Sequence, residues 1–174
     1  MADSPSDNIA ENQLAPLHVF RFQVDFRRDS IGSGSGSDSV ALCSGAFAEC
    51  TGLEATMEVK VIKGGGMNYG PAQRSGAVSF ATVVLKRGMT STRDLWKWFD
   101  WVAGGKYAYR LAVDITMFDI AGNPVLTWHL NRAMPVKFKA ADLNAKSTEV
   151  GIEELHLVHE GLSMSTSATA AALV

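Results

Sequence analysis

The strongest constraint on the fold is the alternation of apolar and polar residues near the middle of the chain. Residues 107–118 read YAYRLAVDITMF. One parity holds the apolar side chains, Tyr109, Leu111, Val113, Ile115 and Met117, and the other holds Arg110, Asp114 and Thr116. A period of two is typical of a β-strand with one buried face and one polar face. The sequence therefore predicts a sheet that is packed on one side and needs water or a partner on the other.

Several further segments have strand character. Residues 18–26 place Phe20, Phe22, Val24 and Phe26 on one parity, opposite Arg21, Gln23 and Asp25. Residues 77–85 are apolar on both parities, which predicts one continuous central strand. In residues 125–138 we expect a common apolar face, formed by Leu126, Trp128, Leu130, Met134, Val136 and Phe138. Pro135 indicates a sheet edge or a bulge in that strand, and residues 151–162 predict the final strand.

One short helix is predicted after residue 90. Ser91 and Asp94 have the spacing of a capping box, so we expect the helix to begin near residue 91. Its apolar stripe is formed by Leu95, Trp98, Phe99 and Val102, with Trp96 and Trp101 beside it. The Gly104-Gly105 pair predicts its end. Arg93, Lys97 and Asp100 are expected on the outward side.

A long projecting β-hairpin is predicted between Glu54 and Pro71. Met57, Val59 and Val61 alternate with Glu58 and Lys60 before a run of glycines at 64–66. The flanking composition predicts a flexible arm at 1–16, one domain over 17–164 with a Gly/Ser-rich loop at 29–39, and a flexible tail at 165–174.

Composition excludes several classes of function. The 174 residues are 47% hydrophobic with a net charge of −2. The sequence lacks the cluster of Lys and Arg that a dedicated nucleic-acid-binding protein uses to neutralise phosphates, so we do not expect that function. No apolar run is long enough to span a membrane, and the polar start is unlike a secretory signal, so we expect assembly in the cytoplasm. His156 and His159 lie in a strand pattern, where residues three apart diverge, so they do not predict a metal site. We find no catalytic constellation and expect neither enzymatic activity nor a cofactor.

Six segments, in this order and spacing, together resemble the tail tube family of contractile phages, most closely the inner-tube subunits of extracellular contractile injection systems. They are GAFAECTGLEATMEV (45–59), GGGMN (64–68), LKRGMT (85–90), LWKWF (95–99), FDIAGNPVLTWHLNRAMPVKF (118–138) and LVHEGL (157–162). The resemblance covers residues 17–162. It implies a mainly β fold, a two-sheet antiparallel β-barrel or sandwich with one flanking α-helix and a long projecting hairpin.

The resemblance also implies a structural subunit whose hexameric rings stack into a tube. The lumen would carry an effector protein or DNA, and contraction of a sheath would propel the tube. Partners would be further copies, the sheath protein, baseplate or spike proteins, and a terminator or cap. The residues expected to face the lumen are Arg21, Gln23, Asp25, Arg110, Asp114 and Thr116.

Two further surfaces follow from the same resemblance. Contacts between rings are expected from the hairpin, through Met57, Val59, Val61, Gly64, Gly65, Gly66, Met67 and Asn68. The helix residues Arg93, Lys97 and Asp100 would face the sheath. The alternative reading is a monomeric β-barrel whose polar parities line an internal small-ligand pocket. The sequence does not distinguish a phage tail from an injection system, nor a main-tube subunit from a paralogue near the baseplate.

Overall fold

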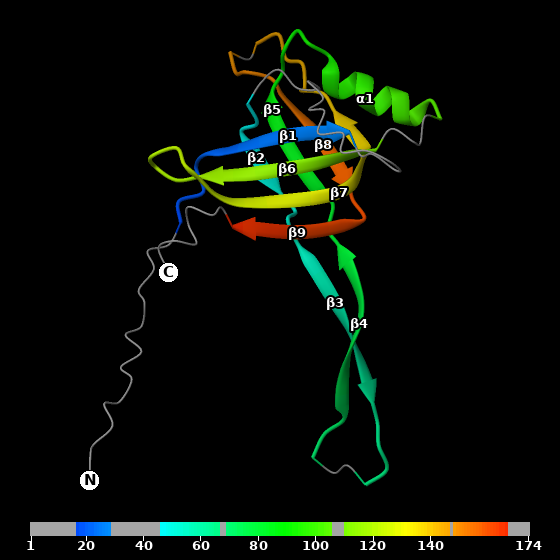
Figure 1. Ribbon diagram of the computed structural model, residues 1–174. Coiled ribbons are helices and arrows are strands. Elements are labelled where there is room, and N and C mark those ends of the chain that lie inside the picture. The colour runs from blue at the N-terminus through cyan, green and yellow to red at the C-terminus, as the bar shows by residue number, and fades with distance from the viewer. Residues whose placement is uncertain (1–16, 29–45, 67–68, 106–109, 147, 167–174) are drawn as a thin grey trace, which may run out of the picture.

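A computed structural model describes residues 17–28, 46–66, 69–105, 110–146 and 148–166 (Figure 1). The predictions made for residues 1–16, the loop 29–39, Met67, Asn68 and residues 167–174 lie outside this part of the chain.

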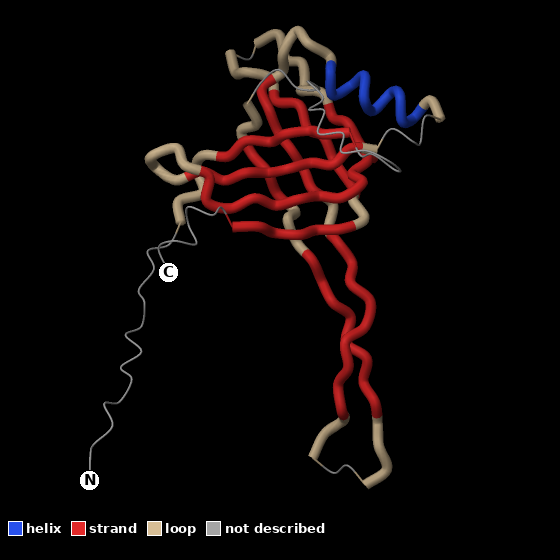
Figure 2. The backbone as a smooth tube through the Cα atoms, viewed as in Figure 1, coloured by secondary structure: helices blue, strands red, loops and turns tan. Residues whose placement is uncertain are grey.

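The described strands form two layers and a separate hairpin, and all their pairings are antiparallel. The front sheet has the order β1-β6-β7-β9, with β1 Phe22–Arg28, β6 Leu111–Phe118, β7 Pro124–Lys139 and β9 Gly161–Thr166. The back sheet has the order β2-β5-β8-β7, with β2 Glu49–Thr51, β5 Val83–Gly88 and β8 Ile152–Val158. Figure 2 shows the strands of one layer crossing those of the other.

The alternation of β6 places its apolar parity in the core. Leu111, Val113, Ile115 and Met117 are buried. The first three belong to one core cluster with buried residues of the back sheet, Val83, Leu85, Leu155 and Leu157. Within the described chain β1 and β2 end the strand order without pairing to each other. The sheets therefore form an open sandwich, which confirms the predicted mainly β, two-sheet antiparallel fold in its sandwich form.

Strand β7 belongs to both sheets because a bulge reverses its parity. The pairs Leu111↔Ala133 and Val113↔Leu130 leave two β7 residues opposite one β6 residue, and Arg132 has φ 51°. Ala133 is buried, whereas Val136 is 43% exposed. The predicted common face from Leu126 to Phe138 therefore fails at Val136, whereas Met134 and Phe138 are partly buried and pack against the core. A second register shift follows Pro135, as the proline indicated.

Two predicted strand boundaries are corrected. Residues 77–85 are not one strand, because β4 ends at Phe80 and β5 begins at Val83. The break is needed because β4 pairs within the hairpin whereas β5 pairs with β8 and β2. The final segment forms two strands with a turn at residues 159–160, and β9 reaches Thr166, which includes the first two residues of the expected tail.

Helix α1 spans Asp94–Ala103 and covers one end of the sandwich, where it contacts β7 (Figure 1). It begins later than predicted, because Arg93 occupies the N-cap position without a side-chain cap. The Thr90 hydroxyl instead bonds to Thr92 Oγ1 at 2.9 Å. Leu95, Trp98 and Val102 are buried, and the helix ends at Gly104-Gly105 as predicted. In the described chain no helix has the length and apolar character that a membrane crossing requires.

The predicted hairpin is formed by β3 Ala55–Ile62 and β4 Ala72–Phe80, and it projects away from the sandwich (Figure 2). Its returning strand is longer than the sequence indicated, since pairing continues to Phe80. All of β3 is exposed. At Gly76 an added Cβ would lie 2.6 Å from the carbonyl oxygen of Glu58, so the strands approach each other here only because the residue is glycine.

Candidate assembly surfaces

The outer face of the front sheet is a continuous polar surface across four strands. Strand register places Asp25, Asp114, His129 and Ser163 in one row. The adjacent row contains Gln23, Thr116, Thr127 and Ser165. Four of the six residues expected at the lumen, Gln23, Asp25, Asp114 and Thr116, therefore share this surface, which we call the polar face.

Side chains of the polar face form a hydrogen-bonded network. Asp114 pairs with Arg27 and accepts from His129 Nδ1 at 2.7 Å, so the His129 Nε2 atom can accept from the Ser165 hydroxyl at 2.8 Å. Asp114 lies directly opposite Asp25, an unfavourable like-charge pair that the Arg27 guanidinium offsets. The face is thus ordered yet hydrophilic, as a surface in contact with water requires.

Asp114, His129 and Ser165 are hydrogen-bonded in the same sequence as the acid, base and nucleophile of a serine hydrolase. Ser165 lies on a strand, however, and strand N–H groups lie in the plane of the sheet while side chains project from it. An oxyanion site needs N–H groups directed at the bound carbonyl, which this in-plane arrangement does not favour. Hydrogen bonds among the three residues link β6, β7 and β9 across the face.

Two of the expected lumen residues lie apart from the network. Arg21 precedes β1, and its guanidinium lies 5.9 Å from the centre of the Phe20 ring. Arg110 precedes β6 and pairs with Glu160, which also contacts Arg132 at 2.9 Å. The two arginines are at opposite ends of the front sheet.

Sequence reasoning missed five members of the polar face, namely Arg27, Thr127, His129, Ser163 and Ser165. The signal existed for Thr127 and His129, because they alternate with Leu126, Trp128 and Leu130. Ser163 and Ser165 could not be recognised in this way, because they follow a turn and lie in a segment whose polar composition resembles that of a tail.

The hairpin has two chemically distinct faces. Met57, Val59 and Val61 form an apolar face, and they are 53%, 55% and 53% exposed. The other face carries Glu58, Lys60 and Arg74, and Lys60 and Arg74 are direct cross-strand partners. Gly64, Gly65 and Gly66 lie in the exposed loop that follows β3.

The outward side of α1 exposes Arg93, Lys97 and Asp100, as the helical period predicts. Trp96 and Trp101 beside it are 46% and 41% exposed. This surface mixes both charges with two large aromatic rings, a composition suited to contact with another protein.

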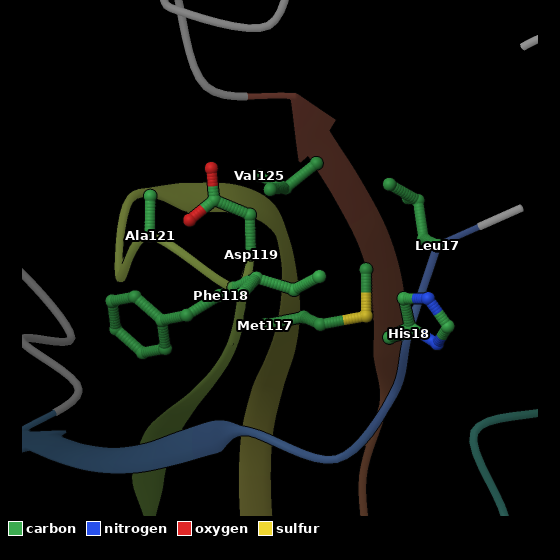
Figure 3. Close-up of a pocket in the computed structure, with 8 residues that line it drawn as sticks. Leu17, His18, Met117, Phe118, Asp119, Ala121 and Val125 are labelled. Atoms are coloured by element: carbon green, nitrogen blue, oxygen red, sulfur yellow. The ribbon is translucent and has the colours of Figure 1, made fainter. Parts of the chain in front are cut away.

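The rival small-ligand reading requires the polar parities to surround an internal pocket. They lie outside the sandwich, whereas the core between the sheets is apolar. A pocket of about 380 Å³ between β2 and the front sheet is lined mainly by apolar residues such as Phe22, Ile115 and Trp128, and by none of the predicted polar residues. A hollow of about 310 Å³ lies beside the β6–β7 turn. Figure 3 shows residues that line it, including Leu17, Met117 and Asp119. The Asp119 carboxylate accepts bonds from Asn123 N at 2.8 Å and Nδ2 at 3.1 Å, and these bonds lower the pKa of Asp119. This carboxylate stabilises a turn.

Buried titratable groups lie beneath these surfaces. Arg87 Nε donates to Glu153 Oε1 at 2.5 Å, and the two side chains are 1% and 8% exposed. Within the described part of the chain, the Nη1 and Nη2 atoms of Arg87 have no hydrogen-bond partner. Burial raises the pKa of Cys50 to about 11 and lowers that of His159, whose Nδ1 donates to the Gly161 carbonyl. The described residues contain no cluster of three metal-ligating side chains.

Comparison with known proteins identifies the family. The sequence model of the family described as T4-like virus tail tube protein gp19 matches residues 18–163. The chain belongs to this family. Members of the tail tube family are structural proteins, so the protein is a structural tube subunit and the small-ligand reading is not favoured. No curated protein sequence matches the chain significantly.

Solved structures show the same fold as this tail tube family member. A chain in the six-fold symmetrised cryo-EM structure of the anti-feeding prophage baseplate has 29% identity and a TM-score of 0.72, covering 88% of this chain and 97% of that one. A chain of the sheath–tube complex of an extracellular contractile injection system has 18% identity and a TM-score of 0.70, with coverages of 95% and 100%. Hcp1 from Flavobacterium johnsoniae has 11% identity and a TM-score of 0.50, with coverages of 83% and 95%.

Proposed function

We propose that six copies of this tail tube protein form a ring, and that stacked rings make the inner tube of a contractile injection system or a contractile phage tail. The observation that carries the proposal is the front sheet, which is apolar toward the core and polar over its whole outer face. A wall of a water-filled channel has this construction. The six-fold baseplate and the sheath–tube complex among the similar structures support it.

The edges of the front sheet support ring formation. In the described chain β1 pairs only with β6 and β9 pairs only with β7, so each leaves one row of backbone N–H and C=O groups unpaired. Pairing of β9 in one copy with β1 in the next would extend the sheet from copy to copy. Closure of the ring would then remove both edges, which otherwise favour aggregation.

The three assembly surfaces receive separate roles. The polar face, with Arg21 and Arg110 at its ends, lines the lumen, where its mixed charges contact a protein effector or DNA. The apolar face of the hairpin, together with its loop through Met67 and Asn68, stacks one ring on the next. The outward side of α1 meets the sheath. The tube ends at baseplate or spike proteins on one side and at a terminator or cap on the other. It assembles in the cytoplasm as part of a phage tail or of a released particle. Its role involves no catalytic step.

The test replaces Val59 and Val61 by aspartate. The V59D/V61D protein should keep its fold by circular dichroism but form no filaments by negative-stain microscopy, because charges would enter a surface that a neighbour must cover. A matched control, K97D/D100K on α1, changes two exposed residues away from the hairpin and should leave filaments intact. Filaments of normal length from V59D/V61D would contradict stacking by the hairpin.

The ring itself has an independent test. A cryo-EM map of the assembled tube should place Asp25, Asp114 and His129 at the channel wall. A map with these side chains on the outside of the ring, or a wild-type protein that sediments at 18.7 kDa at high concentration, would refute the proposal.

A further inference from the structure

We propose that the basic face of the hairpin docks in an acidic groove at the opposite end of a second copy of this chain. This inference rests on the proposed function and names the receiving surface, which that function leaves unspecified.

The distal part of the hairpin is strongly basic. Residues 59–75 contain Lys60, Lys63 and Arg74 and no acidic residue. Lys60 and Arg74 lie directly opposite each other on exposed strands, and like charges in this arrangement destabilise a strand pair. An isolated two-stranded ribbon is already marginal in water. The hairpin is therefore expected to need a neighbour that supplies negative charge.

A groove with the complementary charge lies at the other end of the molecule. It has a volume of about 500 Å³, and its charged lining consists of Lys139, Asp142, Glu149 and Glu154. Lys139 and Glu154 lie 3.8 Å apart and balance each other. With Asp142 and Glu149, three of the four charged residues in the lining are acidic.

The rim of the groove is apolar and exposed. Leu143 is 89% exposed, Val150 75% and Met89 47%. Long basic side chains bury their methylene stems on such a rim while the charged ends reach acidic groups. The groove thus fits Lys60, Lys63 and Arg74 in shape and in charge.

The position of the two surfaces determines the kind of assembly. The hairpin leaves one end of the sandwich, and the loop at 140–151 lies at the other end (Figure 1). A contact between different surfaces of identical copies is heterologous. Each copy would therefore dock its own hairpin in the groove of one neighbour and bind the hairpin of another neighbour in its own groove. At roughly 3.3 Å per residue, β3 reaches roughly 25 Å, which is far enough to extend over a neighbouring copy. The apolar face of the same hairpin stays available for the stacking contact proposed above.

Charge exchange in the full-length protein tests the pairing. K60E/R74E and D142K/E149K should each reduce the mass of pelletable filaments at least tenfold, because each variant opposes like charges. The quadruple variant K60E/R74E/D142K/E149K should restore filaments, since the attraction is re-formed with the signs exchanged. R93E/K97E, with the same change in net charge as K60E/R74E, is the control; the assay uses the purified protein without a sheath, so this variant should form filaments normally. Circular dichroism confirms that each variant is folded.

The outcomes separate this inference from the proposed function. Normal filaments from D142K/E149K, or failure of the quadruple variant to recover them, would overturn the docking site and leave the tube intact. Loss of DNA binding by K60E/R74E with normal filaments would assign the basic face to nucleic acid and overturn it as well. A wild-type protein without rings or filaments would refute both proposals.

Discussion

Replacing both members of the buried ion pair Arg87–Glu153 should cost far less stability than replacing either one. The pair is almost fully enclosed, at 1% and 8% side-chain exposure, and the Arg87 guanidinium carbon lies 6.0 Å from the centre of the Phe47 ring. Removing one partner leaves an uncompensated buried charge, which costs about 3–5 kcal/mol. This is a large part of a domain stability of about 5–15 kcal/mol.

The double replacement R87M/E153L removes both charges and fills a similar volume. Two guanidinium nitrogens of Arg87 have no hydrogen-bond partner among the described residues. The contacts of the pair therefore do not fully offset the free energy that burying its two charges costs. If the two sites were independent, the double variant would lose about 6–10 kcal/mol, the sum of the single losses. We expect it to lie within about 1–2 kcal/mol of the parent protein, because such exchanges are often neutral or stabilising.

The assay is denaturation in urea followed by tryptophan fluorescence. It is carried out in the V59D/V61D background, so that stacking does not contribute to the free energy of unfolding, and at one protein concentration, so that ring formation contributes equally to all four proteins. The four proteins of the cycle should have equal m-values, and a changed m-value would show that the denatured state had changed. Additive losses in the double variant would refute the view that the ion pair acts as one unit.

Three shorter predictions follow. Trp98→Ala should lower the free energy of unfolding by about 3–5 kcal/mol in urea titrations, because its ring is fully buried, and a loss under 1 kcal/mol would contradict the packing of α1. Gly76→Ala should abolish filaments while the circular dichroism of the sandwich persists, because the new methyl would meet the Glu58 carbonyl; normal filaments would show that the crossing can relax. The lowered pKa of His159 means that the unfolded chain binds its proton first, so stability is present above about pH 6.5 and falls as the pH drops below it. The urea midpoint of His159→Gln should therefore fall less between pH 7 and pH 5 than that of the parent protein, and equal falls would refute the assignment.

The local pattern was sufficient to predict most elements of the fold. The alternation from Leu111 to Met117 identified β6 and its buried face, because the period of side chains along a strand is independent of its partners. The stripe of Leu95, Trp98 and Val102 likewise identified the buried side of α1. The projecting hairpin was predicted from a strand that ends in glycines.

The errors arose where the tertiary structure overrides the local pattern. A bulge at Arg132 shifts the parity of β7. Its positive φ could not be predicted from the sequence, because arginine is not a residue type that favours this conformation. The break between Phe80 and Val83 is a change of strand partners, which leaves no mark in a run of apolar residues. The helix start depends on hydroxyls that bond to each other, whereas the spacing of Ser91 and Asp94 predicted a cap.

The candidate surfaces were predicted less completely, because they combine strands that are distant in the sequence. Asp114 and Gln23 were found from parity alone. His129 and Ser165 required the register of β7 with β6 and β9, which depends on turn geometry and on the bulge. The groove that contains Asp142 is formed by two loops and has no periodic signal.

The shared strand β7 has a mechanical consequence for a tube that is driven forward. Its 16 residues run without interruption from the front sheet into the back sheet. In the proposed tube, a tensile force applied to the back sheet would therefore reach the front sheet through covalent bonds. Two layers joined only by apolar contacts could slide past each other under shear, whereas here sliding would require strand β7 itself to be torn from its neighbours.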